Sequence, residues 1–318
     1  MLKLIVAPKT ALGGYISREF FFIIDSLERR FGWRQLETWE LANDRRPLRT
    51  VLLDRLGSIP EVILFWEQYE LFTSRARELW QLGIQIGIWA DDIHSFSDAV
   101  RLSRVAPFVL ADKVLAAYAN RFEEFYPLVR KGADLIWVPH SASADFVVRL
   151  NEAPEAAVFV SGAITSHYPM RRQMKALHEE GCVPLVFFEH PGYHCEFNHE
   201  SDERVGNGYA RNIARHLAAF TDGLVYGYLV AKFFEIPATG ALLLGEERMK
   251  DALASLGFRD GVHYLSVNPE NLKARIEEAL ERSNRKAIDE IRRQGQKLVL
   301  ERHSVEHRAK QIDEVFDA

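Results

Sequence analysis

The sequence predicts an α/β protein built from two parallel sheets, each wrapped by helices. Short runs rich in Val, Ile and Leu alternate along the chain with segments of helical periodicity, which is the pattern of repeated strand–helix–strand units. Several runs are apolar at every position, as in strands that helices cover on both faces. The 318 residues, 47% of them hydrophobic, suffice for two domains of roughly 100 to 200 residues each. A disordered chain is excluded.

The first half contains six candidate strands and two clear helices. A polar stretch at 151–155 includes Pro154 and interrupts the pattern, so we place the domain boundary there, with domains at 1–154 and 155–318. The strands are expected at 2–7, 50–53, 62–66, 84–89, 109–111 and 135–138, and the helices at 17–30 and 74–81.

The second half has the same alternation of apolar strands and helices. Asn268 followed by Pro269 has the cap-then-proline order that begins a helix near the C-terminal end. Two parallel-sheet domains that face each other form a cleft, and such sheets bind ligands outside the carboxyl ends of their strands. Candidate site residues are therefore sought just after strands, which are expected here at 157–160, 184–188, 223–225, 241–244 and 263–266.

Composition narrows the function classes. With 45 acidic and 40 basic residues the formal charge is -5, so no broad positive surface is expected to bind nucleic acid. The two cysteines, Cys182 and Cys195, favour a reduced, cytoplasmic protein without a disulfide. No segment resembles a secretory signal, and none approaches the roughly 20 apolar residues that cross a bilayer. At most a peripheral contact with a membrane is expected.

The most informative segment is AKFFEIPATGALLL, residues 231–244. Its helical part places Lys232 and Glu235 on one face. This helix is expected to end at Gly240, where the chain turns into an apolar strand. This segment resembles the donor-binding helix of GT-B glycosyltransferases, in which a Glu accepts hydrogen bonds from the nucleotide ribose; Glu235 is the matching residue. Residues 158–313 resemble more specifically the enzymes grouped with the spore-maturation protein CgeB and the C-terminal domains of families 1 and 4. The segments SGAITSHYPMRRQM, EHPGY, GNGYARNIARHLAAF and LERHSVEHRAKQID carry this resemblance.

The resemblance implies two Rossmann-like domains facing a cleft, with C-terminal helices that can cross back to the first domain. It implies transfer of a sugar from a nucleotide-diphosphate donor such as a UDP-sugar, held by the second domain. The acceptor would be a hydroxyl of a glycan, a polysaccharide, a lipid-linked sugar or a small molecule, held by the first. Gly227 stands where family 4 has the first of two paired glutamates, so the stereochemistry of transfer is left open.

A departing nucleotide diphosphate develops negative charge, which cations or backbone amides must stabilise. Lys232, Arg171 and Arg172 are the candidates, although a surface Lys232–Glu235 pair and ordinary exposed arginines remain alternatives. Ser161 and Gly162 either let the donor approach the chain closely or form a tight turn. The remaining donor-side candidates are His190, Tyr209 and Arg211, for which a plain surface loop or helix packing is the alternative reading.

A metal site is not favoured. The loop EHPGYHCEFNHE contains His190, His194, Cys195, Glu196 and His199, but their spacing matches no standard zinc pattern. The sequence also lacks Asp-x-Asp, the metal-chelating pair of most GT-A glycosyltransferases, and it lacks GxGxxG, GxxxxGK[ST] and GxSxG. We therefore expect no metal and no cofactor besides the nucleotide sugar, which is a co-substrate.

In the first half, Asp91, Asp92 and His94 directly follow an apolar strand. One of them could accept the proton of the acceptor hydroxyl; the alternative is a helix-capping Asp and a half-buried His. Gly14 follows the first strand and His140 the last strand of this half, and either a donor contact or a structural role fits each of them.

Three other functions stay open at this point. The chain could be a two-domain protein that closes on a small ligand without turning it over. It could glycosylate modified bases in DNA, although its acidic balance disfavours this. It could also be a nucleotide-sugar epimerase, which would need no acceptor.

Overall fold

The computed structural model describes residues 1–94, 97–129, 134–193 and 196–317. The chain forms two compact units: Met1–Gly13, Phe20–Pro139 and Arg308–Ala318 make the first, and Gly14–Glu19 with His140–His307 make the second. The second unit therefore begins earlier than the boundary expected near Pro154. Asn151 is bonded inside this unit, because its Nδ2 donates to Ala214 O at 3.1 Å. The end of the chain returns to the first unit, as the fold expected for this sequence allows.

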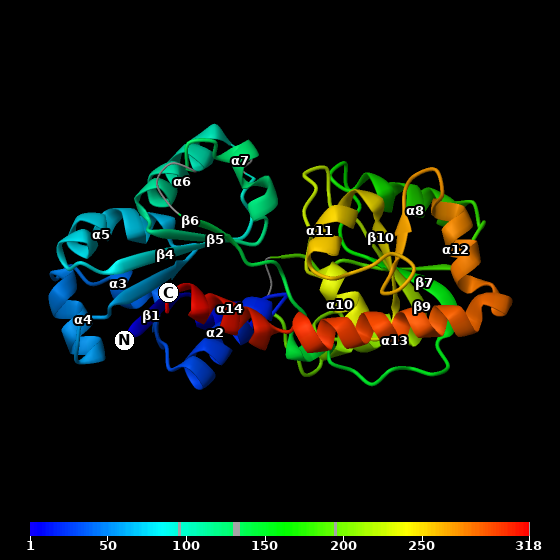
Figure 1. The fold of residues 1–318 in the computed structure, drawn as a ribbon, viewed down its shortest axis with the longest axis horizontal. Coiled ribbons are helices and arrows are strands. Elements are labelled where there is room, and N and C mark those ends of the chain that lie inside the picture. The colour runs from blue at the N-terminus through cyan, green and yellow to red at the C-terminus, as the bar shows by residue number, and fades with distance from the viewer. Residues whose placement is uncertain (95–96, 130–133, 194–195, 318) are drawn as a thin grey trace. The chain divides into compact units, whose positions relative to one another are not determined.

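The first unit is built on a six-stranded, fully parallel sheet (Figure 1) with the order β2-β1-β3-β4-β5-β6. The neighbouring strands β1 and β3 are buried at every position, and β3 is apolar throughout, as expected for a sheet covered on both faces. The strands are β1 (Lys3–Ala7), β2 (Arg34–Glu37), β3 (Val62–Trp66), β4 (Gln85–Ala90), β5 (Lys113–Ala116) and β6 (Asp134–Trp137). The helices of this part of the chain are α1 (Lys9–Gly13), α2 (Glu19–Phe31), α3 (Thr38–Ala42), α4 (Leu48–Leu56), α5 (Tyr69–Gln81), α6 (Asp98–Leu110) and α7 (Phe122–Phe125), together with the C-terminal α14 (Val305–Val315).

Two strand predictions in this half are wrong, and β2 and β5 are missed. Residues 50–53 lie in α4, because Leu48, Val51 and Leu52 form one buried helical face. Gly57 then ends that helix in the left-handed conformation, with φ +78°. Residues 109–111 form the end of α6 and its cap. The strand begins only after Asp112, whose Oδ2 accepts from Ile86 N at 2.7 Å.

The second unit contains a five-stranded parallel sheet with the order β11-β10-β9-β7-β8. Figure 1 shows the long helix α13 (Arg285–Arg302) running along this unit, where it packs against α10 (Lys232–Ala238). The strands are β7 (Glu155–Ser161), β8 (Leu185–Phe188), β9 (His216–Thr221), β10 (Leu242–Glu246) and β11 (Leu265–Val267). The other helices are α8 (Pro169–Glu179), α9 (Gly206–Arg215), α11 (Lys250–Ser255) and α12 (Leu272–Leu280).

Two expectations in the second unit need correction. The strand expected at 223–225 is β9, which ends at Thr221, and the chain then bends through Leu224 at φ +56°. The helix expected to begin at Asn268 and Pro269 begins later: α12 starts at Leu272, and Asn268 instead exchanges hydrogen bonds with Asn271. Within the ranges that the structure describes, no helix is both long and apolar enough to span a membrane.

Candidate functional site

Three of the sequence candidates converge at the carboxyl end of β7. Gly162 follows this strand with φ +100°, and a Cβ built there would lie 2.5 Å from Arg171 Nη1 and 3.7 Å from Lys232 Nζ. A side chain at this position would therefore occupy the space beside the two cations. Bare backbone at Gly162 and the two cationic groups form one surface, which we call the cation cluster.

Arg171 is fixed by a buried carboxylate. Its Nε forms an ion pair with Asp222 Oδ1 at 2.9 Å, and its backbone N–H donates to Asp222 Oδ2 at 3.2 Å. The guanidinium also lies over the ring of Tyr168, 3.8 Å from its centroid. Arg172 is exposed and lines a separate hollow with Lys175, because successive helix residues are about 100° apart. The structure therefore brings Arg171, and not Arg172, to the cation cluster.

Lys232 and Glu235 lie one turn apart on α10. Burial lowers the pKa of the Lys232 ammonium, and Arg171 acts in the same direction while Glu235 opposes it. Burial raises the pKa of the Glu235 carboxyl to about 7, against the opposing effect of Lys232. Glu235 is only 6% exposed, so these residues do not form an ordinary surface pair. Each group depends on the other's charge to stay ionised.

His190, after β8, adds a neutral hydrogen-bond donor. Burial lowers its pKa to about 4, and Lys232 and Arg171 act in the same direction. Its Nδ1 accepts from Gly192 N at 3.0 Å, so the single proton of the neutral ring is on Nε2. Arg171, Lys232 and His190 thus all present N–H groups, and none of the three side chains can supply an acceptor to the others. An anion could accept hydrogen bonds from all three side chains.

Ser161 and Tyr209 lie at the edge of the cation cluster. Their hydroxyls are 2.5 Å apart, and Lys232 Nζ lies 5.9 Å from the centroid of the Tyr209 ring. Burial raises the pKa of Tyr209, and Glu235 adds to this effect. The ring packs against the aromatic side chains of Phe146, Phe159 and Phe188.

The structure does not bring two further candidates to the cluster. Arg211 is exposed on α9, where its guanidinium donates to Asn207 Oδ1. Gly240 ends α10 with φ +78°, and a Cβ there would lie 2.6 Å from Leu150 Cδ1. Gly240 O accepts from Arg292 Nε at 2.8 Å. A tight turn and close packing explain this glycine.

A short N-terminal segment, Gly14–Glu19, belongs to the second unit. Gly14 O accepts from Phe197 N at 3.0 Å. Glu19 is buried, and its carboxylate accepts from His140 Nδ1 at 2.7 Å and from Ser141 Oγ at 2.8 Å. Glu19 and His140 also act on the charge state of Glu235. Gly14 and His140 therefore belong to the unit that carries the cluster, and Glu19 is a neighbour that sequence reasoning missed.

In the first unit, Asp91, Asp92 and His94 lie together after β4, and they are joined by Glu67. Asp92 Oδ1 is 3.8 Å from His94 Nδ1. Glu67 directly follows β3 and has a left-handed conformation, φ +57°, which is uncommon for a residue with a side chain. Its Oε1 accepts from Asp91 N at 3.3 Å, and burial together with Asp91 raises its pKa to about 8. Glu67 directly follows the apolar run VILFW, and this position after a strand was the signal that could have found it.

Residues 185–314 match the family model described as glycosyl transferase-like. Among solved structures, HepE of Anabaena in complex with UDP matches over 100% of both chains, at a TM-score of 0.61 and 11% identity. These chains share the GT-B fold. A glycosyltransferase from Rickettsia africae matches over 99% of this chain and 97% of its own, with a TM-score of 0.61 and 8% identity. Sucrose-phosphate synthase from Thermosynechococcus elongatus matches over 100% and 98%, with a TM-score of 0.59 and 12% identity. Comparison with curated protein sequences finds no significant match.

Among the residues that the structure describes, no group of three or more His, Cys, Asp or Glu side chains is placed to hold a metal ion. His199 instead bonds to the backbone, with Nε2 2.8 Å from Tyr15 O. His194 and Cys195 lie outside the described residues. The expectation that Cys195 forms no disulfide therefore stays a prediction.

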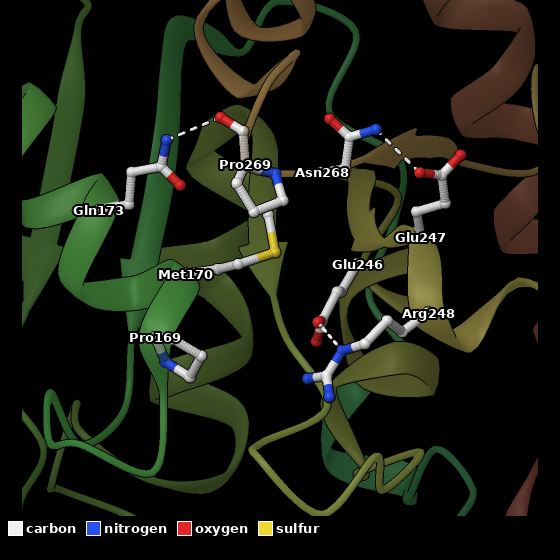
Figure 2. A pocket seen from close by; sticks show the side chains of 8 residues that line it. All are labelled: Pro169, Met170, Gln173, Glu246, Glu247, Arg248, Asn268 and Pro269. Atoms are coloured by element: carbon white, nitrogen blue, oxygen red, sulfur yellow. Dashed lines mark hydrogen bonds and ion pairs between the residues drawn. The ribbon is translucent and has the colours of Figure 1, made fainter.

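The second unit also has a hollow of about 540 Å³ at the carboxyl ends of β10 and β11 (Figure 2). Its polar groups bond to one another: Gln173 donates to Pro269 O and Asn268 to Glu247, each at 2.8 Å, and Arg248 pairs with Glu246. Glu246 Oε2 also accepts from Gly223 N at 2.7 Å. This wall therefore braces the loop that carries Asp222. The hollow is lined by Pro169, Met170, Gln173, Glu246, Glu247, Arg248, Asn268 and Pro269.

Proposed function

We propose that this protein is a glycosyltransferase, which takes its sugar from a nucleoside-diphosphate sugar, specifically a UDP-sugar, held by the second unit. The observation that carries the proposal is the cation cluster, where Arg171 and Lys232 lie beside bare backbone at Gly162, together with His190, whose pKa both cations lower. A diphosphate supplies the acceptor oxygens that these groups lack. The UDP bound to HepE supports this donor class.

The same groups serve the chemical step. When the bond between the sugar and the diphosphate breaks, the electron pair remains on a phosphate oxygen. Arg171 and Lys232 stabilise this developing charge in a site that is already organised for it. Two cations then supply what a divalent metal supplies in other transferases, so the proposal includes no metal. Glu235 accepts hydrogen bonds from the ribose hydroxyls.

The first unit is proposed to hold the hydroxyl acceptor. Its polar cluster of Glu67, Asp91, Asp92 and His94 lies at the carboxyl ends of β3 and β4, where parallel sheets bind ligands. Carboxylates and an imidazole are the groups that position a hydroxyl and accept its proton. A reduced, cytoplasmic setting is part of the proposal and rests on the low cysteine content, two in 318 residues.

Calorimetric titration with UDP and UDP-glucose tests the donor assignment. Glu235→Gln is expected to weaken both ligands by about 10- to 100-fold, the effect of losing hydrogen bonds to a charged group. Glu277→Gln, an exposed residue of α12, is the matched control and should bind like the wild type. Unchanged affinity in Glu235→Gln would remove Glu235 from the donor site. Slow release of UDP from UDP-glucose would distinguish an enzyme from a protein that only binds its ligand.

Donor affinity should also depend on pH. The Glu235 pKa is raised to about 7, and the carboxylate is the form that accepts from hydroxyls, so binding should strengthen as pH rises from 6 to 8. The expected gain is about tenfold, since each pH unit below a pKa lowers the ionised fraction about tenfold. UDP-glucose is the suitable ligand, because its diphosphate is esterified at both ends and keeps its charge. The gain should disappear in Glu235→Gln; a gain that persists there would assign it to another group.

A further inference from the structure

We infer that Asp222 is a positioning residue of the donor site, a buried carboxylate that fixes the direction in which Arg171 presents its guanidinium to the diphosphate. This inference rests on the proposed function and names a residue that lies on the far side of Arg171 from the ligand. Asp222 has no exposed surface and Arg171 is 3% exposed. The carboxylate holds Arg171 at both ends of the residue, through Nε at 2.9 Å and through the backbone N–H at 3.2 Å.

These contacts leave one edge of the guanidinium for a ligand. Nε faces Asp222, and Nη1 donates to Ala163 O at 3.3 Å. Tyr168 covers one face of the group. Within the residues that the structure describes, Nη2 has no hydrogen-bond partner. A long arginine side chain held on two sides loses little further freedom when it binds, and this pre-organisation favours binding of a phosphate at the free edge.

Asp222 is in turn held by the loop that follows it. Gly223 N donates to Glu246 Oε2 at 2.7 Å, and Leu224 is strained at φ +56°. Arg248 joins both parts, since its guanidinium bonds to Glu246 and to Leu224 O. Figure 2 shows the Glu246–Arg248 pair on the wall of the hollow. A strained residue persists where its surroundings fix the backbone. We infer that the fixed loop holds the Asp222 carboxylate in one position beside Arg171.

The test is calorimetric titration of UDP into the full-length protein and its variants. Asp222→Asn and Arg171→Met are each expected to weaken UDP by about 10- to 100-fold. The double variant should bind no more weakly than Arg171→Met alone, because Asp222 acts through Arg171. Asp202→Asn is the control: this carboxylate pairs with Arg204, and among the described residues no ion pair or hydrogen bond joins it to Arg171 or Lys232. It should bind UDP like the wild type.

The inference is overturned if Asp222→Asn binds UDP as tightly as the wild type, or if its loss adds fully to that of Arg171→Met. A wild-type protein that binds neither UDP nor UDP-glucose would instead refute the proposed function, and with it this inference. Removing one partner of a buried ion pair can prevent folding, so Asp222→Glu is a second variant. It keeps the charge but moves the carboxylate by one methylene, and it should remain folded while binding UDP more weakly. Wild-type affinity in folded Asp222→Glu would also contradict the inference.

Discussion

Gly162→Ala is expected to lower affinity for UDP by about 100-fold or more. A Cβ at this position lies 2.5 Å from Arg171 Nη1, closer than any real contact, so the guanidinium must leave its place. Arg171 cannot move easily, because Asp222 holds it at Nε and at the backbone. A charge-assisted hydrogen bond contributes about 1.5–3 kcal/mol, and the left-handed backbone at φ +100° adds strain of about 1–3 kcal/mol for any residue with a side chain.

Gly181→Ala separates the two causes. Gly181 also has a positive φ, +65°, but nothing lies within 4 Å of a Cβ built there. This control should lose stability through backbone strain and keep its UDP affinity, as measured by thermal melts and by calorimetry on the same samples. Equal losses of affinity in the two variants would show that strain alone, and not the contact with Arg171, explains the effect of Gly162→Ala.

The pairing of Lys232 with Glu235 was predictable because its signal is local in the sequence. The two residues are three positions apart, and helical spacing alone brings them to one face. The same argument could not choose between Arg171 and Arg172. That choice depends on where α8 begins, at Pro169, and on a carboxylate supplied by the loop after β9.

The parts that were missed come from segments far apart in the chain. Asp222 meets Arg171, and Glu19 meets His140, across separations of 51 and 121 residues. A single sequence holds no local pattern for such pairs. The same limit explains the strand placed at 223–225: that segment is apolar in part, but the hydrogen bonds of Glu246 and Arg248 to Gly223 and Leu224 hold it as a loop.

Glu67 shows a different limit, because its position after an apolar strand was visible but its environment was not. The structure places its carboxyl in a buried site beside Asp91, and this raises its pKa to about 8. Near neutral pH Glu67 therefore keeps its proton, and it can donate a hydrogen bond to an acceptor hydroxyl but cannot accept the proton of that hydroxyl. The base proposed for transfer is then sought among Asp91, Asp92 and His94.

The raised pKa of Glu67 also predicts how stability depends on pH. Folded Glu67 holds its proton up to about pH 8, whereas an unfolded glutamate releases it near its ordinary value of about 4.3. The stability that this group contributes is therefore complete below that ordinary pKa and is lost as pH rises to about 8, by about 1.4 kcal/mol per pH unit. Glu67→Gln cannot ionise, so the variant should melt close to the wild type at pH 5 and clearly above it at pH 9.

Thermal melts at the two pH values check this expectation, and Glu70→Gln is the control. Glu70 is exposed in the first turn of α5, so its removal should change the melting temperature by a similar small amount at both pH values. The glutamine at position 67 keeps the size of the side chain and the strained φ, which leaves the charge as the only difference. If Glu67→Gln and the wild type differed equally at pH 5 and pH 9, Glu67 would not hold a proton in the folded state, and it would return to the list of candidate bases.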